Sequence, residues 1–248
     1  MAIAQSNIKK PWDMIELISR IVDDSRFSTF KPLYGPNLVC GWGFIGGWPI
    51  GIIANNNVLF PSEAQKATQF IRLCNTREVP IIFLHNITGF MVGRQYEEAG
   101  MIKAGSMMIA AVTNSTVPHI SVVCGASYGA GNYAMCGRAY RPRFLWSWPT
   151  ARCSVMGGEQ LAGVMDIVAR DSSARAGKKV DEEKLGMQKM LLTQSVEDQS
   201  DVYYTSSRLL DDGIIDPRQT RNVLIMSLNV TNLQKFKGNP AMAGISRI

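Results

Sequence analysis

Apolar runs alternate with amphipathic stretches over most of the chain. Residues 12–24 carry apolar positions at helical spacing and end in acids, so they predict an opening amphipathic helix. Residues 38–57 predict two short strands around a Gly-Gly-Trp-Pro turn. A helix capped by Ser62 is predicted over 62–78, and it leads into a strand over 80–86. The first third therefore predicts helix, hairpin, helix and strand.

The middle of the chain repeats strands, glycine loops and helices. A glycine-bearing loop is predicted over 86–93 and a helix, rich in Ala and Met, over 95–114. A strand over 117–125 then leads into the run 125–137, which holds four glycines and three alanines in thirteen residues. This order predicts an α/β fold of stacked ββα or βαβ units. Both glycine loops then lie at equivalent strand ends, where parallel sheets bind ligands.

The last third predicts one more strand and several helices. The strand is expected over 143–148, and a helix is expected to start at the pair Gly157-Gly158. Residues 171–200 are polar and charged, which is typical of an excursion, part loop and part helix, outside the core. A further helix is predicted from Val202 to Leu210. We interpret residues 1–248 as a single domain, with a core over 11–230 and a tail over 231–248 that docks elsewhere.

Composition excludes several classes of protein. With 248 residues, 46% of them hydrophobic, the chain can bury one large core. The net charge of +6 comes from scattered basic residues without a long basic stripe, which argues against nucleic acid. No apolar run reaches the ~18 residues of a membrane span, and no signal peptide is evident. Five cysteines without metal spacing predict buried free thiols, no metal site and an intracellular protein.

Three interpretations compete for the run 125–137. Glycine lets a ligand reach the main chain, so successive N–H groups at a strand-to-helix turn can form an oxyanion hole. The residues 125–129 also fit G-x-S-x-G, the nucleophile elbow of serine hydrolases, with Ser127 as nucleophile. That fold places its histidine after the serine, whereas His85 and His119 both precede Ser127. In the third interpretation, small residues only let a helix pack closely on a sheet.

Ionisable candidates for catalysis are few. His85 lies in an apolar strand, where a histidine is usually a satisfied core residue. Glu97, Glu98 and Glu159 are expected in the first turns of helices, where carboxylates favour the helix dipole. A site built from backbone donors suits a reaction in which the substrate or cofactor brings its own base.

Several long segments resemble a known family. They are LYGPNLVCGWGFIGGWPIGIIANNNVLF, FLHNITGFMVGRQYE, GASYGAGNYAMCGRAYRPRFLWSWPTARCSVMGGEQ and SSRLLDDGIIDPRQTRNVL. Together they resemble the C-terminal half of the carboxyltransferase β-subunit of biotin-dependent acyl-CoA carboxylases, in the methylcrotonoyl-CoA and geranyl-CoA carboxylase branch. The resemblance runs from Pro11 to the final GISRI. It implies a crotonase-like (ClpP/crotonase) fold of stacked ββα units.

The resemblance also implies an enzyme activity and a mechanism. In this family N1-carboxybiotin, delivered on a separate carrier domain, releases CO2 and leaves a biotin enolate that deprotonates the acyl-CoA. One oxyanion hole, in the N-terminal half, serves the acyl thioester; the other, in the C-terminal half, serves biotin. The chain is thus expected to transfer a carboxyl group to a methylcrotonoyl-CoA-like acyl-CoA and to supply the biotin side.

Mapped onto this sequence, the resemblance implies specific site residues. The catalytic donors are expected to be backbone N–H groups of Phe90, Ala130 and Gly131. The residues expected to line the biotin pocket are Gly89, Tyr128, Gly129 and Asn132. Gly89 and Phe90 contribute from the first glycine loop, across the pocket from the second.

The family resemblance leaves the other half of the site unaccounted for. A full β-subunit carries an N-terminal half with the acyl-CoA site, so we expect this chain to need that half as a partner. We also expect it to work with a biotin carboxyl carrier and its biotin carboxylase subunit, and to form an oligomer. The expected compartment is the bacterial cytoplasm or, alternatively, the mitochondrial matrix. A non-catalytic structural homologue is the alternative function, disfavoured by the intact glycine loops. The acyl chain is not assigned, because its pocket lies largely in the other half.

Overall fold

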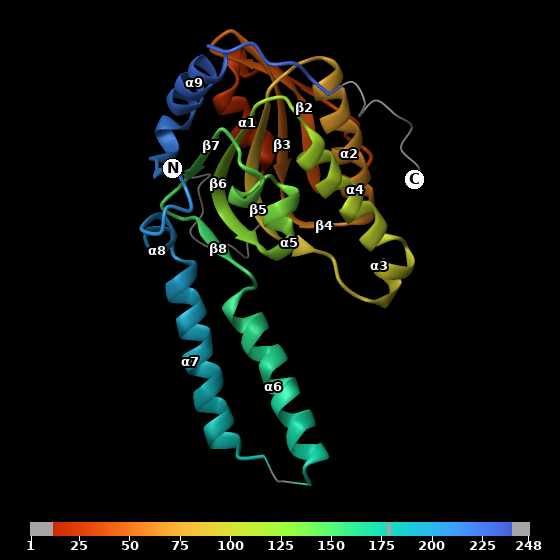
Figure 1. Cartoon of the computed structure of the whole chain (residues 1–248), viewed down its shortest axis with the longest axis vertical. Helices are drawn as coiled ribbons and strands as arrows, with labels where there is room; N and C mark the ends of the chain where they lie inside the picture. The colour runs from red at the N-terminus through yellow and green to blue at the C-terminus, as the bar shows by residue number, and fades with distance from the viewer. Residues whose placement is uncertain (1–11, 178–179, 240–248) are drawn as a thin grey trace.

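The computed structural model describes residues 12–177 and 180–239, and over these it forms one nine-stranded sheet covered by helices (Figure 1). The order is β1-β2-β3-β5-β6-β7-β9, with β4 paired to β5 and β8 paired to β6. The antiparallel part is β1 (Phe27–Thr29), β2 (Leu38–Ile45) and β3 (Trp48–Asn55). The parallel part is β4 (Asn57–Leu59), β5 (Ile81–Phe90), β6 (His119–Tyr128), β7 (Phe144–Ser147), β8 (Arg152–Ser154) and β9 (Gly213–Ile214). The predicted α/β class is confirmed.

Alternation along the central strands separates two hydrophobic cores. Ile81 and Phe83 of β5 belong to one core, and Ile82 and Leu84 belong to the other, as the two-residue period of a strand requires. The first face is covered by α2 (Pro61–Thr76) and α4 (Met101–Asn114), and the second by α1 (Met14–Ile21) and α9 (Thr220–Thr231). The largest fully buried side chain, Trp148, lies in the second core.

The turn of the predicted hairpin consists of two glycines only. Gly46 (φ 60°) and Gly47 (φ 81°) take the left-handed conformations of a tight hairpin turn, while the Trp-Pro pair already belongs to β3. The Asp23 carboxylate accepts hydrogen bonds from both glycine N–H groups, at 2.9 and 2.8 Å. Arg221 of α9 contacts the same carboxylate at 2.6 Å. Asp23 therefore ties the hairpin to α9.

We expect Asp23 to make stability depend on pH. The N–H of Gly47 is the main cause that lowers the pKa of Asp23, with Arg221 adding to it against the opposing effect of burial. A carboxyl whose folded-state pKa is depressed stabilises the fold above its unfolded pKa of about 3.9 and loses that contribution as the pH falls through the folded value. Urea unfolding should therefore separate the wild type from Asp23→Asn more at about pH 6 than at about pH 3. An equal difference at both pH values would contradict this assignment.

One predicted helix start and one predicted loop are wrong. The second helix begins at Pro61, with Phe60 as N-cap, so Ser62 is not the cap. Pro61 suits the first helical position because its φ is fixed and its missing N–H is not needed there. The hydroxyl of Ser62 instead donates to the Glu63 carboxylate at 2.9 Å. The loop predicted over 86–93 is β-strand as far as Phe90, because β4 pairs with this end of β5.

The helix predicted over 95–114 is broken. A short helix, α3 (Arg94–Glu98), precedes α4, and Gly100 between them has φ +90°. A left-handed residue ends a helix because the backbone can no longer continue the hydrogen-bond ladder. The helix predicted from Val202 to Leu210 is also shorter, ending at Ser206 as α8 (Val202–Ser206). The described part of the chain also forms three short 3₁₀ turns: Asp23–Ser25, Arg138–Tyr140 and Pro217–Gln219.

A helical hairpin projects from the body (Figure 1). It consists of α6 (Gly158–Arg175) and α7 (Glu182–Ser200), so most of the predicted polar excursion is helix. Each helix is about 27 Å long at ~1.5 Å per residue. Across the hairpin, Arg170 contacts both carboxylate oxygens of Glu182, at 2.7 and 2.8 Å. Its exposed apolar face consists of Val164, Met165, Ile167, Val168, Met187, Met190 and Leu191.

The C-terminal strap, residues 232–239, leaves α9 and runs back to the ends of α2 and α4 (Figure 1). The Thr116 hydroxyl donates to the Lys237 carbonyl at 2.7 Å, and the Asn239 side chain donates to the Asn114 carbonyl at 3.1 Å. Phe236 packs on the first core, whereas α9 packs on the second. The rest of the predicted tail, 240–248, lies outside the described residues.

Candidate functional site

The two predicted glycine loops meet at one end of the sheet. Strands β5 and β6 run parallel, and their ladder ends at the pair Ile87 and Ser127. Directly after β6 the chain enters the short helix α5 (Gly129–Ala134). A Cβ built on Gly131 would lie 3.2 Å from the Cα of Gly89, so the start of α5 is in contact with the end of β5.

The backbone of Phe90 lies at the junction between the end of β5 and the start of α5. Along a strand, successive N–H groups point to opposite sides. The N–H of Met91 donates to the Leu59 carbonyl of β4 at 2.8 Å, so the N–H of Phe90, one residue earlier, points away from β4. The Phe90 ring packs on the first core, near Gly105 of α4. Core packing of the ring thereby orients the backbone donor.

The first turn of α5 supplies further donors. No side chain caps this helix, and the N–H groups of a first helical turn have no partner within the helix. These groups carry the positive end of the peptide dipoles. Ala130 is exposed, whereas Gly131 is buried against β5. The arrangement can therefore hold a negatively charged oxygen between the strand end and the helix start.

The glycines of the run 125–137 are explained by packing within the chain. An added Cβ would lie 1.9 to 2.9 Å from neighbouring atoms at all four positions: Gly125 (Asn86 side chain), Gly129 (Val155 carbonyl), Gly131 (Ile87 side chain) and Gly137 (Asn132 side chain). The packing interpretation therefore accounts for these four residues. Gly89 differs, because a Cβ there would meet no atom within 4 Å and its φ is +141°. Open space thus adjoins the strand end.

Two of the expected pocket residues turn into the fold. Tyr128 is only 7% exposed and its ring lies near Gly157, at the start of α6. Burial and, secondarily, the Glu197 carboxylate raise the pKa of Tyr128 to about 12, so its hydroxyl stays protonated. The Asn132 side chain donates to the Ser127 hydroxyl at 2.8 Å. Asn132 therefore ties α5 to β6.

The serine of the G-x-S-x-G match is not available as a nucleophile. Ser127 Oγ lies 2.9 Å from His85 Nδ1, which brings serine and histidine together despite their chain order. Both side chains are fully buried, so no substrate reaches them. Burial lowers the pKa of His85 to about 4, and its Nε2 has no hydrogen-bond partner among the described residues. His85 is the buried core residue that was predicted, although only one of its nitrogens is satisfied.

The predicted carboxylates lie on helices α3 and α6. Glu98 ends α3 rather than opening a helix, and it pairs with the exposed Arg94 at 2.7 Å. Glu97 lies in the first turn of α3, as predicted, and is also exposed. Glu159 lies in the first turn of α6, as predicted. The contacts described above bring none of these carboxylates to the end of β5 or the start of α5.

A cavity of about 180 Å³ beside α5 was not predicted. It is lined by Asn132 and Tyr133 of α5 and by side chains from several other segments, among them Val123, Leu145, Ser147, Cys153, Thr205 and Asp211. One carboxylate oxygen of Asp211 is buried without a hydrogen-bond partner among the described residues. The lining residues come from separate strands and turns, so no local motif could have identified them.

The described residues contain no group of three or more His, Cys, Asp and Glu that could hold a metal ion. All five cysteines are free thiols, four of them buried. Burial raises the pKa of Cys40 and of Cys136 to about 12, which keeps both thiols protonated. Within the same described part of the chain, no helix is long and apolar enough to cross a membrane.

Comparison with known proteins matches residues 2–241 to the carboxyl transferase domain family. A probable biotin-dependent acyl-coenzyme A carboxylase beta2 subunit of Mycobacterium tuberculosis is 54% identical, over 96% of this chain and 45% of that protein. The mitochondrial methylcrotonoyl-CoA carboxylase beta chain of Dictyostelium discoideum is 48% identical, over 98% and 41%. The geranyl-CoA carboxylase beta subunit of P. aeruginosa superposes with a TM-score of 0.87 at 43% identity, over 96% and 45%.

The chain thus spans less than half the length of these relatives. The expected fold is confirmed, since these β-subunits have the crotonase-like fold. The expected branch is also confirmed by the methylcrotonoyl-CoA and geranyl-CoA carboxylase relatives. The chain belongs to the carboxyl transferase domain family and corresponds to the C-terminal part of the β-subunits of biotin-dependent acyl-CoA carboxylases.

Proposed function

We propose that this chain is the biotin-side half of a carboxyltransferase that moves a carboxyl group from carboxybiotin to a methylcrotonoyl-CoA-like acyl-CoA. One observation carries the proposal: the open strand end at Gly89 and Phe90 meets the uncapped start of α5. Backbone donors converge there, and the junction needs no ionisable side chain. That suits a reaction in which the cofactor supplies the base.

In this proposal the chain contributes an oxyanion hole. When bound, carboxybiotin would supply the CO2 and the base for the proton of the acyl-CoA. The N–H groups of Phe90, Ala130 and Gly131 stabilise negative charge on the ureido oxygen. Each such donor contributes about 3 kcal/mol of transition-state stabilisation. Gly89 leaves room for the ring, while Asn132 and Tyr128 hold the turn from behind.

We further propose that a companion half completes the site. The chain spans under half of its relatives, and both helices of its projecting hairpin expose large apolar side chains. Exposed apolar faces of this kind mark interaction surfaces. The companion half, carrying the acyl-CoA site, covers that face in an oligomer, and a biotinylated carrier docks between the halves. We place the assembly in the cytoplasm or, as for the Dictyostelium relative, the mitochondrion.

A second candidate function is a scaffold subunit without catalysis. One observation favours it: the four glycines of the run 125–137 are accounted for by packing inside the chain. A scaffold keeps that packing but has no use for the open space at Gly89. Binding of free biotin separates the two functions, since only a carboxyltransferase half should bind it.

The deciding experiment is transfer from a carboxylated acyl-CoA donor to free biotin. We expect no transfer with this chain alone and measurable transfer once the N-terminal half of the Mycobacterium tuberculosis relative is added. Carboxybiotin is measured directly, with each half alone as a control. Absence of both transfer and biotin binding, with the two halves shown to associate, would favour the scaffold.

A further inference from the structure

We propose that the ion pair between Arg152 and Asp201 is a positioning joint. It holds the base of the α6–α7 hairpin against strand β8 and thereby sets the place of the glycine turn at the start of α5. Arg152 contacts no substrate in this proposal and acts through the turn. The role in transfer rests on the proposed function; the structural coupling does not.

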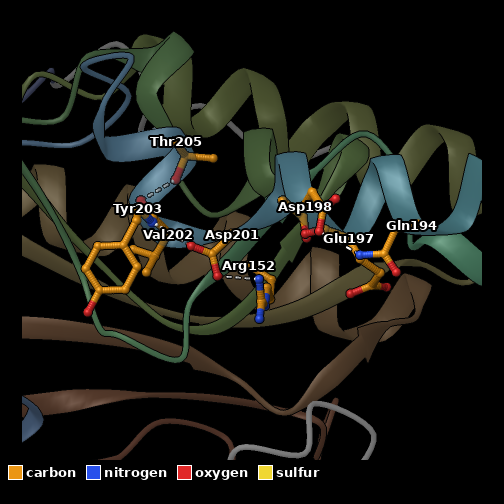
Figure 2. Close-up of polar contacts among 9 residues, drawn as sticks. Arg152, Gln194, Glu197, Asp198, Asp201, Val202, Tyr203 and Thr205 are labelled. Atoms are coloured by element: carbon orange, nitrogen blue, oxygen red, sulfur yellow. Dashed lines mark hydrogen bonds and ion pairs between the residues drawn. The ribbon is translucent and has the colours of Figure 1, made fainter.

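The pair joins elements that are distant in sequence. Arg152 Nη1 lies 2.6 Å from Asp201 Oδ2, and the backbones of the two residues form an isolated antiparallel bridge. Figure 2 shows the pair between β8 and the end of α7. The other oxygen, Asp201 Oδ1, accepts the N–H of Tyr203 at 2.9 Å and so caps α8. One carboxylate thus fixes α7, α8 and β8 together.

Strand β8 passes this constraint to the turn. Arg152 is paired in register with Ala126, and the next two residues of β8 pair with Ser127 and Tyr128. One residue later, the Val155 carbonyl lies 2.9 Å from where a Cβ of Gly129 would be. The strand that carries Arg152 therefore lies alongside the residues just before the turn and contacts its first glycine. A shift of β8 moves the donors of α5.

The charges around the pair make Arg152 the decisive partner. A hollow of about 430 Å³ at the hairpin base is lined by Arg152, Gln194, Glu197, Asp198, Asp201 and Tyr204. Three of these residues are acidic, and Arg152 is the one cation among them. Arg152 also opposes the effect of Glu197 on the pKa of Tyr128, which places both charges near that ring. Removing Arg152 leaves Asp201 beside like charges, which favours separation of the hairpin base from β8.

Because the hairpin is long, a small change of its angle at the Arg152–Asp201 pair displaces its tip. In the proposed assembly the companion half covers the apolar face of α6 and α7, while the turn lies at the hairpin base. A tilt of about 5° at the base of a helix about 27 Å long moves its tip by about 2 Å. Displacements of about 1 Å can cost 100-fold in rate when they misplace catalytic groups. Holding the hairpin angle therefore aligns the two halves and the donors together.

The first test measures the coupling without any activity. Hydrogen–deuterium exchange of the isolated chain should be faster over residues 126–134 in Arg152→Met, by about 10-fold. The matched control is Arg221→Met, which removes another ion pair of 2.6 Å and similar exposure, on the second core. That control should leave exchange over 126–134 unchanged. Unchanged exchange in Arg152→Met would contradict the proposed coupling between the ion pair and the turn.

The second test measures transfer with the companion half present. We expect Arg152→Met to lower kcat about 10-fold, with KM for free biotin changed less than about twofold, because the donors act on the transition state. Arg152→Lys should recover part of the rate, and Arg221→Met should keep it. Faster exchange with an unaltered kcat would overturn the catalytic part of the proposal. A wild type without transfer would instead refute the proposed function, while the exchange result still decides the joint.

Discussion

Gly131→Val is expected to reduce carboxyl transfer by about 1000-fold or more. The added Cβ would lie 2.7 Å from two carbon atoms of the Ile87 side chain and 3.2 Å from the Gly89 backbone. Such contacts force the start of α5 away from the end of β5. Loss of a single backbone donor costs about 3 kcal/mol, or ~100-fold, and displacing the turn moves the Ala130 donor as well. Transfer to free biotin in the presence of the companion half measures the effect.

A surface variant separates this effect from general damage. Ala110→Val adds two methyl groups to an exposed position of α4 and should retain the wild-type rate. Thermal unfolding shows whether Gly131→Val remains folded at the assay temperature. A folded Gly131→Val protein that keeps more than about a tenth of the wild-type rate would be incompatible with donors at this turn.

Trp148→Ala is expected to destabilise the chain by about 4 kcal/mol. The Trp148 ring is 1% exposed and stacks on Trp12, with ring centres 5.7 Å apart. Its indole N–H donates to the Thr220 hydroxyl at 2.9 Å, which links the end of β7 to α9. Truncation to Ala removes the stacking, leaves a large cavity in the second core and breaks this link. Urea unfolding of both proteins at neutral pH measures the difference in the free energy of unfolding.

Trp148→Phe serves as the matched variant. It retains most of the ring packing and loses the N–H, so we expect a loss of about 1–2 kcal/mol. A cost below about 2 kcal/mol for Trp148→Ala would mean that the core collapses around the missing ring.

The element order was predictable because it depends on local patterns. The apolar run in 80–86 and the helical patterns in 12–24 and 62–78 are read directly from neighbouring residues. Element ends were less predictable, because distant segments decide them. Pairing with β4 extends β5 to Phe90, and a left-handed Gly100 divides α3 from α4.

The candidate site was predictable only as a location. The run 125–137 marks a turn where backbones approach closely, and the family resemblance assigns roles to its residues. Local sequence does not reveal what approaches: Asn86, Ile87 and Val155 pack against three of its glycines from other segments. Arg152 could not be singled out either, since its partner Asp201 is 49 residues away.

The C-terminal strap bears on how the chain folds. Its hydrogen bonds join residues that are 121 to 164 positions apart, such as Thr116 with Lys237 and Asn75 with Asn239. Contacts of such high sequence separation close long loops, which favours their formation after the intervening chain is ordered. The strap is therefore expected to dock on a nearly complete fold, where it connects α9 on one face of the sheet to Phe236 on the other.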